Sequence, residues 1–168
     1  MSFFRAVSVA CVVSAVAGTV SCGRFQVFGT KSAVQPPRSK AAVAEPARRA
    51  FAEGAVFAQR YVERGEPPLR DQALQKFDQA LKLDPRVWEA HYDAALVLVR
   101  AGDLRGAEER LAKAAAMAPD VEVVAVALGE VRRRRGAVDS AARTLERFVQ
   151  LHPMAHDARA RLVVVLRE

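Results

Sequence analysis

The sequence predicts an all-α fold built from a repeated unit, and three observations support this prediction. Prolines recur every 34 residues, at Pro85, Pro119 and Pro153. An alanine stands twelve residues before each of these prolines, and a Phe or Leu stands eight residues before it. A glycine lies seventeen residues before the second and the third proline. Agreement at one fixed period indicates an array of structural repeats.

The positions that agree form a register of small and large side chains. They are Ala73, Ala107 and Ala141, then Phe77, Leu111 and Leu145, then Ala80, Ala114 and Phe148, and finally Gly102 and Gly136. This register resembles the tetratricopeptide repeat (TPR), whose unit is a pair of antiparallel helices. The resemblance covers residues 45–168 and implies an all-α TPR solenoid, with helix pairs over about 45–86, 87–120 and 121–154 and a capping helix over 155–168.

Each position of the register has a physical task. The alanine lets the second helix of a pair approach the first closely, and the Phe or Leu one turn later fills the space between them. Proline ends the pair because it has no amide donor and restricts the residue before it. The glycines stand between helices, where a positive φ costs them little. Asp103 and Asp139 follow these glycines and supply turn and N-cap chemistry.

The repeats differ in their details. In the first repeat we expect a helix over 46–64, followed by a loop that Gly65-Glu66-Pro67-Pro68 lengthens. In the second, Ala94-Ala95 stands where the third keeps Leu128-Gly129. In the last helix, 156–168, we expect Leu162, Val165 and Leu166 to pack inward. Val163 and Val164 are then left over, as tolerated surface residues or as a contact for a partner, a second copy or further repeats.

The N-terminus predicts export from the cytoplasm. Residues 6–20 form an uncharged, mostly apolar run of fifteen residues, shorter than the ~18 that a membrane-spanning helix needs and typical of a signal peptide. Thr19-Val20-Ser21-Cys22-Gly23 resembles a bacterial lipobox, although Thr19 replaces the usual Leu. This resemblance implies a signal peptide over 1–21 and lipid attachment at Cys22. The alternative is cleavage after Ala17, which would release a soluble periplasmic protein.

The residues after the lipobox predict where the domain is held. Removal of the signal would leave Cys22 as the only cysteine, which excludes an intramolecular disulfide. Gly23 stands where, in lipoproteins, Asp signals retention at the inner membrane, so the resemblance implies an outer-membrane, periplasm-facing protein. Residues 22–44 contain Pro36-Pro37 and show no period, which predicts a flexible tether about 25 Å long.

Composition and motifs argue against catalysis. The formal charge is +7, but for an exported protein we do not expect a nucleic-acid partner. The three histidines, His91, His152 and His156, have no cysteine partners, and the sequence has no Gly-rich phosphate loop. We therefore expect neither an enzyme nor a bound metal or cofactor.

Binding of a protein partner is the better prediction, because stacked helix pairs leave a concave face made by the first helix of each pair. The resemblance places on this face Glu89, Tyr92, Asp93, Leu96, Val99, Arg100, Val123, Val126, Glu130, Arg133 and Arg134, with Asp157, Arg161 and Val164 extending it. An apolar floor with charged edges suits an extended segment or an amphipathic helix. Some TPR domains clamp a C-terminal carboxylate with Asn and Lys, and with no Asn in the chain that clamp is absent in its usual form.

The sequence thus predicts a non-catalytic interaction scaffold. The full hypothesis is a membrane-anchored TPR lipoprotein that assists the assembly of a cell-envelope complex, of the pilus, secretin or motility type. The alternative is a soluble periplasmic TPR adaptor, or a regulatory subunit of a peptidoglycan or secretion enzyme. Arg133 and Arg134 favour an acidic partner, although cations near a helix C-terminus also complement its dipole.

Overall fold

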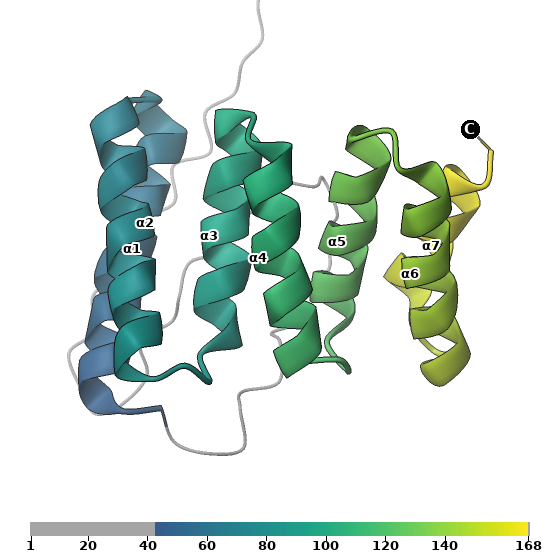
Figure 1. Cartoon of the computed structure of the whole chain (residues 1–168), viewed down its shortest axis with the longest axis horizontal. Coiled ribbons are helices and arrows are strands. Elements are labelled where there is room, and N and C mark those ends of the chain that lie inside the picture. The colour runs from purple at the N-terminus through teal and green to yellow at the C-terminus, as the bar shows by residue number, and fades with distance from the viewer. Residues whose placement is uncertain (1–42, 168) are drawn as a thin grey trace, which may run out of the picture.

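The structure is a computed structural model that describes residues 43–167, and within that range all regular secondary structure is helical. Its helices are α1 (Glu45–Arg64), α2 (Pro67–Leu83), α3 (Trp88–Ala101), α4 (Leu104–Met117), α5 (Glu122–Arg134), α6 (Val138–Leu151) and α7 (His156–Val165). Figure 1 shows the helices following one another along the long axis of the array, with α1 overlapping α2 and α7 behind α6 in this view. The predicted all-α solenoid of helix pairs is confirmed.

The helices pair as the repeat predicts. α1 packs on α2, α3 on α4 and α5 on α6, while α7 covers both α5 and α6. α1 also contacts α3, and α5 contacts α7, although one helix separates each pair in the sequence. Among the described helices, no two even-numbered helices contact each other as extensively. The array therefore bends toward the odd-numbered helices, which form its inner face.

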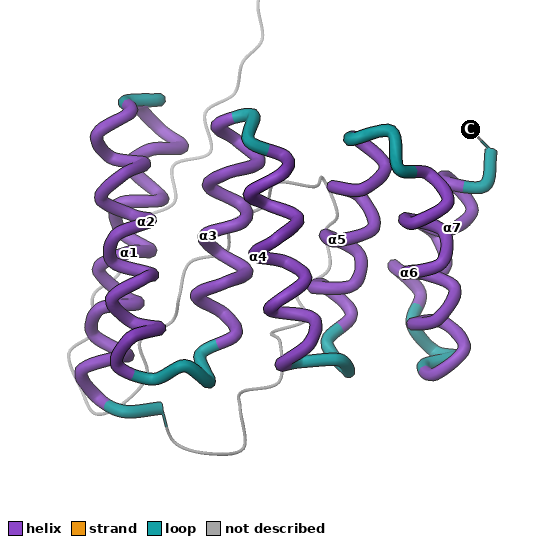
Figure 2. Tube along the Cα trace, in the orientation of Figure 1, coloured by secondary structure: helices purple, strands orange, loops and turns teal. Residues whose placement is uncertain are grey.

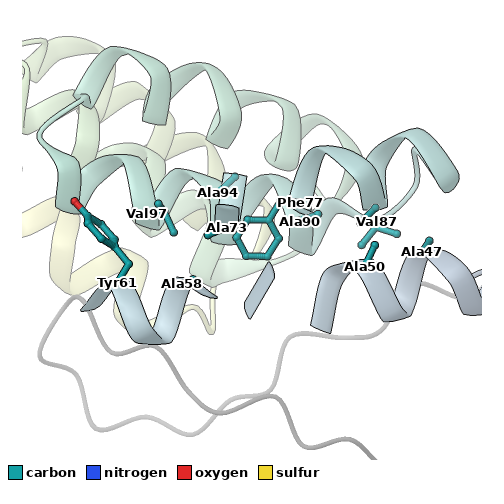
Figure 3. Packing of buried hydrophobic residues seen from close by; sticks show 11 residues of the cluster. Ala47, Ala50, Ala58, Tyr61, Ala73, Phe77, Val87, Ala90, Ala94 and Val97 are labelled. Carbon is teal, nitrogen blue, oxygen red and sulfur yellow. The ribbon is translucent and has the colours of Figure 1, made fainter. Parts of the chain in front are cut away.

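The repeat register is the core of the array. Ala73, Ala107 and Ala141 are fully buried, and so are Phe77, Leu111 and Leu145. Two glycines let these large residues come close: a Cβ added to Gly54 would lie 2.8 Å from the Phe77 ring, and one added to Gly129 would lie 2.9 Å from Leu145 Cγ. Figure 3 shows the first cluster, with the Phe77 ring near Ala73, Ala90 and Ala94.

The turns confirm part of the predicted end signals. Gly102 and Gly136 have φ of 84° and 79° and follow α3 and α5, as expected, and Gly65 does the same after α1 with φ of 71°. The Asp103 side chain accepts a hydrogen bond from the Gly106 amide at 2.9 Å and so caps α4. Asp139 caps nothing, because it lies inside the first turn of α6, whose N-cap is Ala137.

The expected long loop in the first repeat is wrong. α2 already begins at Pro67, so only Gly65 and Glu66 connect the helices. The extra residues lengthen the helices instead: α1 has 20 residues and α2 has 17, whereas α3, α4 and α6 have 14 each. Proline at the first positions of a helix is favourable because its φ is helical and its missing amide has no partner there anyway.

The last helix agrees with expectation only in part. Val165 is buried and Leu162 half-buried, but Leu166 is 62% exposed because α7 ends before it. Val163 and Val164 are each 44% exposed, as predicted. In the 34-residue register Val163 corresponds to Ala95 and Gly129, whose helices are covered by α4 and α6. No helix among the described residues covers α7 in that way.

The predicted signal peptide, Cys22 and the tether up to residue 42 lie outside the described residues. Among residues 43–167 no helix has the length and apolar character that a bilayer-spanning segment needs.

Candidate partner-binding groove

Every residue predicted to line the groove belongs to α3 or α5, two of the odd-numbered helices. α3 supplies Glu89, Tyr92, Asp93, Leu96, Val99 and Arg100, and α5 supplies Val123, Val126, Glu130, Arg133 and Arg134. They divide into an acidic group on α3, an apolar group on both helices, and an arginine group at the end of α5. The three groups differ greatly in exposure, which the sequence did not reveal.

The acidic group consists of Glu89 and Asp93, one helical turn apart. Both side chains are half-buried, and Oε2 of Glu89 is shielded from solvent without a hydrogen-bond partner in the described part of the chain. Burial raises the pKa of Glu89. Burial, and then the charge of Glu89, raises the pKa of Asp93 to about 7. Two poorly solvated carboxyl groups side by side favour a proton or a cation between them.

The apolar group is mostly core. Leu96 is 2% exposed and Val99 is 7% exposed, and Val99 packs in a cluster with Leu111 and Leu128. Tyr92 is half-buried with its ring 6.5 Å from that of Trp88, and burial, together with the Asp93 charge, raises its pKa. Val126 is partly buried against the cluster around Leu145. Val123, at 38% exposed, is the most exposed apolar residue of the predicted floor.

The arginine group is organised around one buried carboxylate. Glu130 is 2% exposed and pairs with Arg133 at 2.9 Å, with Arg134 at 3.0 Å and with Arg161 of α7 at 3.2 Å. Burial by itself raises the pKa of Glu130, but the hydrogen bonds from Arg133 and Arg134 and the charge of Arg161 outweigh it, so the net shift is downward. Three arginines thus share the buried carboxylate of Glu130, which gathers them at the end of α5.

Sequence reasoning missed the centre of this group. The spacing of Glu130 to Arg133 and Arg134, three and four residues, is the usual spacing of a helical ion pair and was visible in the sequence. The pairing with Arg161, 31 residues away, was not. Arg100 also has a structural partner, because its Nη2 donates to the backbone oxygen of Val62 at 2.8 Å and ties α3 to α1.

Two polar groups outside the predicted groove have structural contacts. Arg132 pairs with Glu108 at 2.9 Å and so joins α5 to α4. His152 lies against the Phe148 ring, with centroids 4.5 Å apart. Within residues 43–167 no three His, Cys, Asp or Glu side chains come together as a metal site would require.

Comparisons with known proteins agree with this geometry. The sequence profile of the tetratricopeptide repeat matches residues 70–128. The fold is similar to that of a thermophilic TPR protein from Thermus thermophilus, with 23% identity and a TM-score of 0.61, over 71% of this chain and 63% of that one. This chain thus spans less than two thirds of the length of that relative. No curated protein matches the chain significantly.

Two further structures are similar over most of their own length. The TPR domain of Sgt2 from Aspergillus fumigatus has 17% identity and a TM-score of 0.63, over 75% of this chain and 80% of that one. The second TPR domain of human RPAP3, solved with an HSP70 peptide, has 13% identity and a TM-score of 0.60, over 73% of this chain and 99% of that one.

The fold is an α-solenoid of helix pairs similar to those of tetratricopeptide-repeat proteins, and the repeat profile matches its central part, residues 70–128. Domains of this class are generally protein-interaction modules, and the absence of catalysis stays a prediction.

Proposed function

We propose that the chain is a membrane-anchored scaffold, which binds a segment of a protein partner along the inner face of α3 and α5 and assists assembly of a cell-envelope complex. Its anchor would be a lipid on Cys22, and its location the periplasmic side of the outer membrane. The lipobox-like residues before Gly23 support the anchor, and the TPR fold supports the scaffold. A soluble periplasmic adaptor is the alternative if Cys22 is not acylated.

The observation that carries the binding site is the charge arrangement of the inner face. Poorly solvated carboxyl groups lie on α3, at Glu89 and Asp93, and an arginine-rich centre lies at the end of α5. Such a face orients a peptide that has a cation at one end and an anion at the other, because the reversed peptide meets like charges. In RPAP3 a comparable domain holds a short HSP70 peptide, which supports an extended segment as the partner here.

The binding site is tested by crosslinking from the face itself. A photoreactive amino acid replaces Val123, which is exposed on α5, or Val56, which is 51% exposed on α1 outside the predicted groove. We expect a discrete partner adduct from position 123 and none from position 56 in cells of the native host. Equal adducts from both positions would move the site away from the inner face. Leu96 and Val99 are unsuitable, because substitutions at buried residues disturb the fold first.

The anchor is tested separately, with the full chain and Cys22→Ala expressed in a didermic bacterium. We expect the wild-type protein in the outer-membrane fraction, with an intact mass that includes the lipid, and the variant unprocessed or soluble. If both are soluble and begin after Ala17, the periplasmic adaptor is the correct interpretation.

A further inference from the structure

One edge of the array exposes apolar side chains at equivalent positions of every repeat. Leu83, Met117 and Leu151 are the last residues of α2, α4 and α6, and they are 45%, 37% and 65% exposed. Met154, in the loop after α6, is 79% exposed. Each of the first three stands two residues before a register proline, so the 34-residue period places them in one row.

This row lies on a single edge because each even-numbered helix runs toward the same end of the array. Figure 2 shows the loops after α2, α4 and α6 together on that edge. The opposite edge has the loops after α1, α3 and α5, at residues 65–66, 102–103 and 135–137, and none of these residues is a large exposed hydrophobic. α7 also ends at this edge, where Leu166 is 62% exposed. Exposed apolar side chains thus recur in every repeat at the first edge, whereas at the opposite edge Leu166 stands after the last helix alone among the described loops.

The described chain also begins at the apolar edge. The Ala44 amide donates to Asp84 Oδ2 in the loop after α2, at 3.5 Å, and Val43 packs against the first core cluster. Asp84 is itself 4% exposed and is held by Arg86 at 3.0 Å. In Figure 1 the start of α1 lies on the same edge as the loop between α2 and α3. The preceding segment therefore leaves the domain beside Leu83.

We propose that this apolar edge, formed by Leu83, Met117, Leu151 and Met154, is a membrane-contact surface that rests in the headgroup region of the bilayer to which Cys22 is attached. The inference rests on the proposed anchor. The sequence predicts a flexible tether between Cys22 and the described domain, and a flexible chain of about 20 residues spans about 25 Å. A link this short raises the effective concentration of the edge at the bilayer to the order of millimolar, so four side chains with weak individual affinity suffice.

This orientation has a consequence for the groove. The helix axes run from one edge to the other (Figure 2), so with one edge on the bilayer the helices stand roughly along the membrane normal. The inner face of α3 and α5 then opens sideways, parallel to the membrane surface. A partner that is itself in the membrane or beside it can reach the groove without displacing the anchor.

The test attaches the chain to vesicles chemically, so that it does not depend on acylation in cells. The chain from Cys22, which contains every described residue, is coupled through its single thiol to a maleimide-headgroup lipid in phosphatidylcholine vesicles. A second lipid carries a photoreactive diazirine near its headgroup, and mass spectrometry locates the lipid adducts after illumination. One variant combines three changes on the apolar edge, Met117→Asp, Leu151→Asp and Met154→Asp. Val56→Asp is the matched control, since Val56 is an exposed apolar residue away from that edge.

We expect adducts on the peptides around residues 83, 117 and 151–154, several-fold above those on the loops of the opposite edge. The triple variant should lose most of these adducts while keeping its helical circular dichroism, and Val56→Asp should keep them. Equal labelling of both edges, or labelling unchanged in the triple variant, would overturn the proposal. Crosslinks between two chains through these peptides, in place of lipid adducts, would also overturn it, because a second copy would then cover the edge.

Failure of this test and failure of the proposed function are separable. If cells do not acylate Cys22, the intact mass shows it, while the vesicle pattern is unaffected because the link is chemical. If the mass confirms acylation and the vesicle pattern is uniform, the anchor stands and only the membrane-contact edge is lost.

Discussion

The close contact between Gly129 of α5 and Leu145 of α6 gives a sharp test of why the third repeat packs as it does. A Cβ at position 129 would lie 2.9 to 3.1 Å from three carbon atoms of Leu145, which is fully buried. Gly129→Val therefore forces a branched side chain into occupied space. Leu145→Ala does the opposite and leaves a cavity at the same place.

The expected free energies follow from these two effects. Overpacking costs about 1 to 3 kcal/mol, from which the better helix propensity of Val subtracts about 0.4 kcal/mol. Removal of the buried leucine costs about 3 to 5 kcal/mol. In the double variant the valine methyls occupy part of the vacated volume, so its loss of stability should be smaller than the sum by about 1 to 2 kcal/mol.

The assay is urea unfolding followed by circular dichroism, on the wild-type chain, the two single variants and the double variant. The control pairs Gly129→Val with Phe77→Leu, because Phe77 of α2 lies in a separate core cluster, which residues of α1, α2 and α3 form. That pair should be additive within about 0.5 kcal/mol. Additive losses for the Gly129 and Leu145 pair would refute the reasoning, since the glycine would then not be there to admit the leucine.

Two further predictions concern the charged groups of the inner face. The pKa of Asp93 is raised from 3.8 to about 7, so its contribution to stability is fully present below pH 3.8 and is lost, by up to about 4 kcal/mol, as the pH rises through 7. Asp93→Asn should thus raise the melting temperature more at pH 8 than at pH 5, and an equal change at both would contradict the shift. The pKa of Glu130 is lowered, so its contribution is present above about 4.5 and falls away in acid. Glu130→Gln should lower the free energy of unfolding by about 1 to 3 kcal/mol at pH 7, because the arginines around it then repel one another. It should also make the free energy of unfolding fall less steeply in acid. Glu109→Gln, at the exposed pair with Arg105, is the control and should change neither quantity.

The repeat register was predictable because it is local and periodic. A helix in which Ala73 and Phe77 share one face, followed by Pro85, can pack in only a few ways, and the same constraint recurs 34 and 68 residues later. Gly102 and Gly136 were equally informative, since a positive φ after a helix strongly favours glycine. The length of the first loop was not predictable, because Pro67 and Pro68 suit the start of a helix as well as a loop.

The predicted groove stays a prediction in its membership, and the exposure of its residues was not predictable. The resemblance to the tetratricopeptide repeat implies its residues, whereas their exposure depends on how closely neighbouring helices approach. Leu96 and Val99 are consequently core rather than surface, and Val123 keeps the exposure that a contact residue needs. The ion pair between Glu130 and Arg161 joins two helices that only the packing brings together.

The sequence by itself therefore determined the helices, their pairing and the alternation of loops, because hydrophobic period, proline and glycine act over a few residues. The tertiary structure alone decided which charges meet, which apolar residues remain exposed, and that the chain enters beside the apolar edge. These properties depend on distances between helices, and such distances are set by the whole packed array rather than by any one segment.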